Sequence, residues 1–172
     1  MSSPATEADL RTVTEQLGRP VRDVVAIAAR TRGGVPAVVS TAPRLADGTP
    51  FPTFYYLTHP VLVAAVSRLE AEGLMREWSD LVAPEGPYAA EYAAAHAAYL
   101  ADRAAAGEVE EIAGISAGGM PVRVKCLHAL AGHALSAGAG VNPIGDLALA
   151  TAAAADPEVA GLIGDWPGPV AR

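Results

Sequence analysis

Hydrophobic residues near the start of the chain recur every three or four positions, which is the period of an α-helix. They are Leu10, Val13 and Leu17. Thr6 precedes the first turn as a capping residue, and Gly18 follows the last turn. Because hydroxyl side chains cap helix N-termini and glycine ends helices, the pattern predicts a helix over residues 6–17.

Three short runs rich in β-branched and aromatic residues come next, with turn residues between them. The runs are residues 23–29, 35–41 and 53–58. Their length and composition are typical of β-strands, and their order along the chain predicts an antiparallel meander. Such a meander needs helices packed against it to be stable.

The rest of the chain shows mainly the helical period. It predicts a helix from Pro60 towards Gly73 and helices over residues 74–82, 88–106, 124–137 and 143–153. We therefore expect an α+β fold, a small antiparallel three-stranded meander packed against a cluster of about five to six helices. Residues 6–153 should form a single domain between a flexible N-terminus (1–5) and a flexible C-terminal tail rich in Ala, Gly and Pro (154–172).

The composition argues against several classes of protein. A net charge of −7 disfavours nucleic acid as a partner, since phosphate binding needs clustered basic residues. No apolar run reaches the ~18 residues that span a bilayer, so we expect no membrane insertion. Cys126 is the only cysteine, which excludes an internal disulfide and fits a reducing, cytoplasmic location.

The most reactive side chains gather between residues 121 and 146. Cys126, His128 and His133 are ligand types that suit zinc or iron. On one straight helix Cys126 and His133 would lie about 10 Å apart, and His128 would point about 200° away from Cys126. Cys126 and His128 can converge only if the helix begins after them, and a further ligand must come from elsewhere. The alternative is a structural cysteine beside hydrogen-bonded histidines.

His59 is a candidate for such a distant ligand, because it stands between a predicted strand and a predicted helix. The helix dipole would lower its pKa there and favour the neutral form that binds metal. Alternatively, His59 only caps the helix.

Basic residues suggest an anion site. Arg30 lies at the tip of the predicted hairpin in R-T-R-G-G, where a guanidinium and backbone N–H groups can hold an anion. Arg123 and Lys125 precede Cys126. The alternative is that all three are solvated surface charges.

Ser116 stands in G-I-S-A-G, a pattern similar to the nucleophile elbow of α/β-hydrolases. No predicted strand precedes this pattern, which argues against an elbow. His96, on the predicted helix 88–106, is expected to be a packed or surface residue rather than a ligand.

Six longer motifs are spread over residues 16–146. They are Q-L-G-R-P at 16–20, R-T-R-G-G-V-P-A-V-V at 30–39, D-G-T-P-F-P-T-F-Y-Y-L-T-H-P at 47–60, S-R-L-E at 67–70, V-K-C-L-H-A-L-A-G-H-A-L at 124–135 and N-P-I-G-D at 142–146. Together they resemble domain of unknown function family 501, a bacterial family common in actinobacteria. The resemblance covers nearly the whole expected domain, but it implies no particular reaction.

The resemblance also bears on the metal ligands. Relatives often carry cysteine at the positions of Thr31 and His59, which together with K-C-L-H would form a metal or iron–sulfur set. In this chain histidine keeps a zinc ligand at one position, whereas threonine loses a ligand at the other. The resemblance thus implies a zinc-type site of His59, Cys126 and His128 or His133 rather than an iron–sulfur cluster.

The leading hypothesis is a pocket for a metal ion, zinc or iron, or for a small anionic ligand. It would be built from the Arg30 hairpin, His59 and the helix that carries residues 126–133. One alternative is a non-catalytic interaction protein. The gene context of the resembled family implies a protein partner in cell division or polyphosphate metabolism. A weaker alternative is a hydrolase of a phosphorylated substrate, with Arg30, Arg123 and Lys125 as the anion clamp.

Overall fold

The computed structural model describes residues 2–169 and has an α+β fold in that range. Its elements are α1 (Glu7–Leu17), β1 (Val24–Arg30), β2 (Pro36–Thr41), β3 (Tyr55–Leu57), α2 (Pro60–Ala71), α3 (Leu74–Leu81), α4 (Ala89–Ala106), the 3-10 helix η1 (Glu110–Ile112), α5 (Leu127–Ala137), α6 (Pro143–Ala155) and α7 (Pro157–Ile163). The predicted fold class and three-stranded meander are confirmed. The helices are slightly more numerous than the five to six expected.

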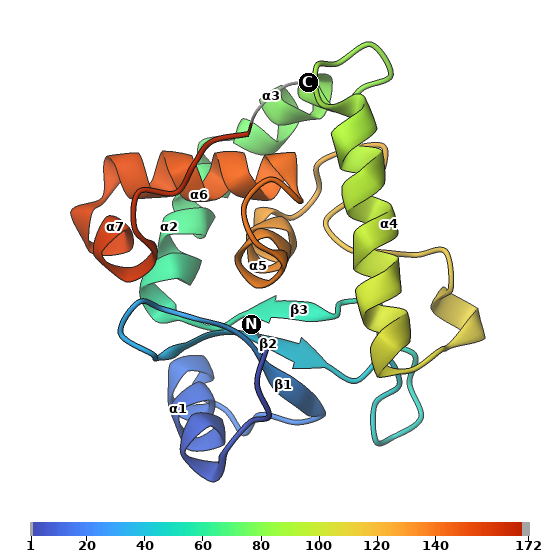
Figure 1. The fold of residues 1–172 in the computed structure, drawn as a ribbon, viewed down its shortest axis with the longest axis vertical. Coiled ribbons are helices and arrows are strands. Elements are labelled where there is room, and N and C mark those ends of the chain that lie inside the picture. Colours follow the sequence, from blue (N-terminus) through green and yellow to red (C-terminus); the bar gives the residue numbers. More distant parts are fainter. Residues whose placement is uncertain (1, 170–172) are drawn as a thin grey trace.

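The three strands form one antiparallel sheet in the order β1-β2-β3, and helices cover both of its faces. Helix α1 covers one face, where Val13 packs with Ile27 and Val39. The other face carries Val38 and belongs to the main core, below α2, α5 and α6 (Figure 1). Every residue of β2 is buried. A central strand between two helical layers explains why both faces of β2 are buried, with apolar residues from Pro36 to Val39 and the small polar residues Ser40 and Thr41 at its end.

Helix α1 begins and ends where the sequence predicted. The Thr6 hydroxyl accepts the Asp9 N–H, and the Asp9 carboxylate accepts the Thr6 N–H, which makes a reciprocal capping box. Gly18 follows with φ of 64°, a conformation that favours glycine. Asp9 also accepts hydrogen bonds from both terminal nitrogens of Arg30, at 2.7 and 2.9 Å. This ion pair connects α1 to the end of β1.

Helix α5 lies at the centre of the fold and makes two close approaches through glycine. Gly132 faces the free edge of β3, where an added Cβ would lie 3.6 Å from the Tyr55 oxygen and 3.7 Å from the Leu57 nitrogen. Gly145 of α6 faces α5, where an added Cβ would clash with the Leu130 carbonyl oxygen. Helix α5 thereby covers an edge strand that would otherwise expose unpaired backbone groups.

Arg103 of α4 holds the loop between α4 and α5 in place. Its side chain is buried, and the guanidinium donates to the carbonyls of Pro52, Ile112 and Ile115. Pro52 precedes β3, whereas the other two residues belong to the loop. One side chain therefore fixes the loop against the sheet, and this loop forms a wall of the site described below.

The two segments that the sequence suggested to be flexible contain an isolated β-bridge at Ser3 and a short helix near the C-terminus. Ser3 pairs with β1 through two backbone hydrogen bonds. Residues 157–163 form α7, which buries Val159 against the main core. The Ala, Gly and Pro content of the tail obscured this short helix in the sequence. Residues 1 and 170–172 of the same two segments lie outside the described range.

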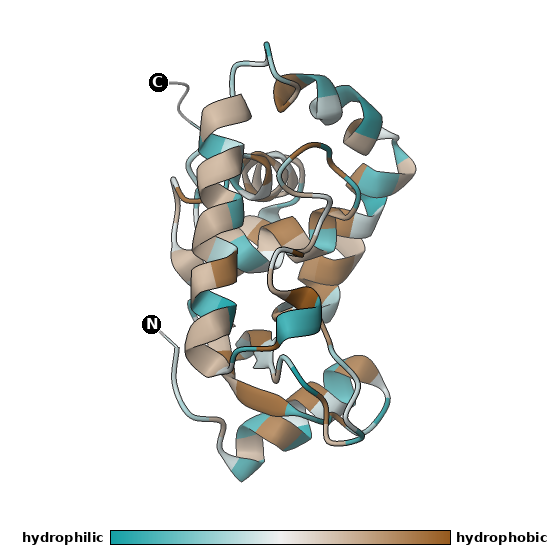
Figure 2. Ribbon diagram, turned by 90° about the vertical axis from the view of Figure 1, so that its right-hand side faces the viewer, coloured by the Kyte–Doolittle hydropathy of each residue, from teal (hydrophilic) through white to brown (hydrophobic). Residues whose placement is uncertain are grey.

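Hydropathy follows this layering. Hydrophobic residues concentrate in the sheet and the central helices, whereas outer helix surfaces and turns carry hydrophilic residues (Figure 2). Within residues 2–169, no helix combines the length and the apolar character needed to cross a membrane.

Replacing Gly145 tests the packing of α6 on α5. We expect Gly145→Ala to lower the free energy of unfolding by roughly 3 kcal/mol, because the new Cβ forces the two helices apart. Gly161→Ala in α7 is the matched control: its Cβ meets no atom within 4 Å. Alanine is also the better helix former, so this control should gain up to about 1 kcal/mol. Urea denaturation measures both, and equal stabilities would contradict the packing.

Candidate functional site

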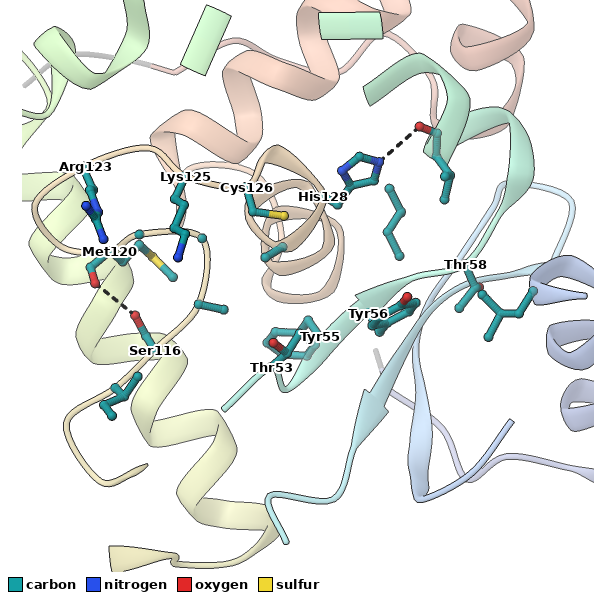
Figure 3. A pocket seen from close by; sticks show the side chains of 18 of the residues that line it. Thr53, Tyr55, Tyr56, Thr58, Ser116, Met120, Arg123, Lys125, Cys126 and His128 are labelled. Atoms are coloured by element: carbon teal, nitrogen blue, oxygen red, sulfur yellow. Dashed lines mark hydrogen bonds between the residues drawn. The ribbon is translucent and has the colours of Figure 1, made fainter. Parts of the chain in front are cut away.

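A groove of about 1150 Å³ opens between β3, the start of α2, the loop before α5 and the first turn of α5. Tyr56 lines it from the strand, Ser116 and Arg123 from the loop, and Cys126 and His128 from the start of α5 (Figure 3). Segments far apart in the sequence thus meet around one hollow. Such a meeting point of elements is where small-molecule sites commonly occur.

Helix α5 begins at Leu127, three residues later than the sequence predicted. The N–H groups of Lys125 and Cys126 both donate to the Gly118 carbonyl, which holds this stretch extended. Cys126 has φ of −149°, whereas His128 lies in the first helical turn. The predicted condition for convergence was too strict, because it is enough that the helix begins after Cys126 alone.

Glu70 of α2 completes a cluster with these two residues. Its Oε1 accepts the Leu127 N–H at 2.7 Å and lies 3.1 Å from Nδ1 of His128. Nε2 of His128 lies 3.1 Å from the Ser67 hydroxyl and 3.3 Å from the Val63 carbonyl oxygen. Val63, Ser67 and Glu70 share one side of α2 because they are four and three residues apart. This side of α2 therefore orients the imidazole.

The charges of the cluster shift the pKa values of His128 and Cys126. The Cys126 side chain raises the pKa of His128 most, and Glu70 adds to this against the effect of burial, so that the pKa reaches about 9. Burial raises the pKa of the Cys126 thiol, but His128 and the Ala129 N–H together lower it by more. Without a metal, neutral pH therefore favours an imidazolium at His128, and the lowered pKa of Cys126 makes its thiolate more accessible than that of an ordinary thiol.

The cluster offers the donor atoms of a metal site. Sγ of Cys126, a ring nitrogen of His128 and a carboxylate oxygen of Glu70 all lie within 4.8 Å of one another. Thiolate, imidazole and carboxylate are all zinc ligands, and catalytic zinc sites have three protein ligands and one open position. A thiolate beside an imidazolium that a carboxylate orients is also the arrangement of an activated cysteine nucleophile.

A family model described as "Protein of unknown function (DUF501)" matches residues 27–150 of the 172-residue chain. The chain belongs to this family. The match spans Glu70, Cys126 and His128, so the DUF501 region contains the whole cluster. The resemblance inferred from the motifs is thereby confirmed. No curated protein and no solved structure matches the chain.

In this DUF501 chain His59 lies apart from the cluster. It is the N-cap residue of α2 but makes no side-chain capping bond, and it does not line the groove. Burial lowers its pKa, while Glu158 of α7 acts in the opposite direction. The structure therefore places His59 towards α7, a helix that the sequence interpretation lacked.

His133 is also separate from Cys126 and is completely buried. Its ring stacks on Tyr55 at 5.6 Å and meets Tyr99 edge-on at 5.2 Å, and Nδ1 lies 3.1 Å from the Asn142 side-chain nitrogen. His133 is thus part of the core and not of the groove.

Of the three basic residues proposed for an anion site, Arg123 and Lys125 line the groove but Arg30 does not. Arg30, at the end of β1, is engaged by Asp9 of α1. A guanidinium paired with a carboxylate in two hydrogen bonds is not available to an added anion.

Glu70 is the member of the cluster that the sequence interpretation missed. It appeared only as the last residue of the S-R-L-E motif, without a role. A usable signal was the spacing of Ser67 and Glu70, two polar residues on one side of a helix next to its apolar stripe. The sequence also gave no partner for His96, whose Nδ1 lies 2.8 Å from the hydroxyl of Ser116.

The buried position of His133 predicts a pH-dependent stability. Burial lowers its pKa to about 4, against the ordinary 6.5, with Asp102 opposing. The unfolded chain therefore takes up a proton between pH 6.5 and 4 that the folded chain does not. The contribution of His133 to the free energy of unfolding is fully present above pH 6.5, and up to about 3 kcal/mol of it is lost as the pH falls towards 4.

We expect His133→Phe to remove this part of the pH dependence, because phenylalanine keeps the ring and does not titrate. Urea denaturation of both proteins between pH 4 and 7 gives the difference in slope. The other titrating groups are common to both proteins and cancel. Parallel curves would contradict a neutral buried imidazole.

Proposed function

We propose that the protein binds a transition metal ion of the zinc type through Glu70, Cys126 and His128, at the wall of the groove. The observation that carries this proposal is the convergence of three different donor atoms within 4.8 Å of one another. Two of the three residues line the groove, so that an open coordination position would face it. A ligand in the groove could then reach the ion.

The hydrogen-bonding pattern favours this proposal. Oε1 of Glu70 is occupied by the Leu127 N–H and by His128, but Oε2 has no hydrogen bond in residues 2–169. A metal could therefore use Oε2 while Oε1 continues to satisfy the first N–H of α5. Binding would require His128 to give up its proton, as imidazole ligands do.

Zinc binding by protein purified without a polyhistidine tag tests the proposal. We expect one zinc ion per chain, measured by elemental analysis and by competition with a chromophoric chelator. Loss of a residue that only supports a metal ligand typically weakens metal binding about 10–100-fold. Cys126→Ser and Glu70→Gln each remove a proposed ligand itself, so each should weaken zinc binding by at least about tenfold. The side-chain amide introduced by Glu70→Gln keeps an acceptor for the Leu127 N–H, which separates ligation from helix capping.

His96→Asn is the matched control, because His96 lies in the same region but outside the cluster. It should leave zinc binding unchanged. Zinc well below one ion per chain, or binding that survives Cys126→Ser, would remove the metal function.

The same cluster supports a second function, that of an activated thiol. Cys126 precedes the first turn of α5, where helix N–H groups favour an anion, and His128 lowers its pKa. In this role Glu70 orients the imidazole instead of binding an ion. The sequence-based hydrolase alternative lacks its third cation, since Arg30 is paired with Asp9.

The rate of alkylation by iodoacetamide tests this second function, and the single cysteine makes the signal unambiguous. At pH 7 we expect His128→Asn to react roughly tenfold more slowly, because an ordinary thiol is only a few per cent thiolate there. His96→Asn should react like the wild type. Saturating zinc should protect the wild-type thiol if the metal function holds. A rate unaffected by His128→Asn would exclude the activated thiol.

A further inference from the structure

The groove carries most of the exposed large apolar side chains in the described part of the chain. Five such residues are exposed, and three of them line the groove: Tyr56 (37% exposed), Ile115 (54%) and Val122 (74%). They come from the strand on one side and from the loop before α5 on the other. Exposed apolar side chains gathered around one hollow indicate a binding surface rather than a random distribution.

The charge of the groove is opposite to that of the whole protein. The basic side chains that line it are Arg123, Lys125 and His128, and no Asp or Glu lines it. The chain as a whole has a net charge of −7. Within residues 2–169, neither Arg123 nor Lys125 forms an ion pair, and Figure 3 shows both extending from the stretch before Cys126 towards the loop of Ser116. The groove is therefore complementary to an anion.

We propose that the groove binds an anionic amphiphile, a small molecule in which a phosphate group is joined to a hydrocarbon chain. The phosphate contacts Arg123 and Lys125, and the hydrocarbon lies along Tyr56, Ile115 and Val122. Cation pairs of this kind recognise phosphate oxygens through charge-assisted hydrogen bonds. This inference names a ligand for the groove of the proposed function, but it does not require the metal ion.

Both halves of the groove support this ligand over the simpler ones. A free phosphate ion would leave the apolar side chains uncovered, and a neutral hydrocarbon would leave two cations without a partner. A protein partner docked in the groove would also account for its exposed apolar residues. However, a hollow of about 1150 Å³ is closer to a small-molecule site, typically about 300–1,000 Å³, than to a flat interface.

Calorimetric titration with octyl phosphate, at concentrations below micelle formation, tests the proposal. Inorganic phosphate and octanol serve as the head-only and chain-only probes. We expect octyl phosphate to bind at least about tenfold more tightly than either. Affinity should rise by roughly threefold for each methylene added between butyl and octyl phosphate. Equal affinity for inorganic phosphate or for octanol would overturn the proposal.

A charge-matched pair of variants locates the site. Arg123→Gln/Lys125→Gln removes the two groove cations, whereas Arg19→Gln/Arg76→Gln removes two exposed arginines outside the groove, at the same net charge. We expect about tenfold weaker binding of octyl phosphate in the first variant and unchanged binding in the second. Equal losses in both would show a diffuse charge effect and overturn the site.

Titrations of metal-free and zinc-loaded protein separate this inference from the proposed function. Binding of octyl phosphate to the metal-free protein supports the amphiphile site even if the zinc experiment fails. Zinc binding without any binding of octyl phosphate in either state overturns the amphiphile site and leaves the metal site standing.

Discussion

The fold depends on the close approach of α5 to the backbone of two neighbours. Gly132 brings the helix against the free edge of β3, and Gly145 brings α6 against the carbonyl of Leu130. The Gly145 contact leaves no room for α6 to approach α5 further, whereas an added Cβ at Gly132 would make an ordinary van der Waals contact with β3. The position of the first turn of α5 relative to β3 is therefore set by backbone contacts in the core. That first turn is where Cys126 and His128 meet the groove.

The start of α5 needs help from another element, because Cys126 makes no side-chain capping bond. Glu70 supplies it by accepting the Leu127 N–H and placing a carboxylate at the positive end of the helix. The same oxygen holds His128. Glu70 thus caps α5 and orients the imidazole of His128 with the same oxygen. The geometry of the cluster therefore depends on the stability of the first turn of α5.

The sequence could predict local features well and long-range pairings poorly. The strands, the capping by Thr6 and most helices follow from spacing and turn residues within a few positions. Arg30 and His59 show the opposite case. Arg30 is engaged by Asp9, 21 residues away, and His59 faces a helix near the end of the chain. Partners at such distances are decided by the packing of whole elements, and residue type alone does not reveal them.

For the same reason, the sequence identified Cys126 and His128 but not Glu70. Cysteine and histidine are rare in this chain, so their proximity is noticeable, whereas a glutamate on a helix resembles the many that face solvent. Only the crossing of α2 near the start of α5 distinguishes Glu70. The two polar residues on that side of α2, Ser67 and Glu70, both contact His128, which explains a polar stripe beside an apolar one.

The metal site and the amphiphile site would act on each other through charge. In the metal-free form with Cys126 as a thiolate and His128 as an imidazolium, the carboxylate of Glu70 leaves the cluster with one net negative charge. With a divalent ion and a neutral imidazole, the cluster becomes neutral. An anion held by Arg123 and Lys125 next to Cys126 is therefore repelled less when the ion is bound. Because coupling between two binding sites is reciprocal, the anionic ligand would in turn strengthen binding of the metal.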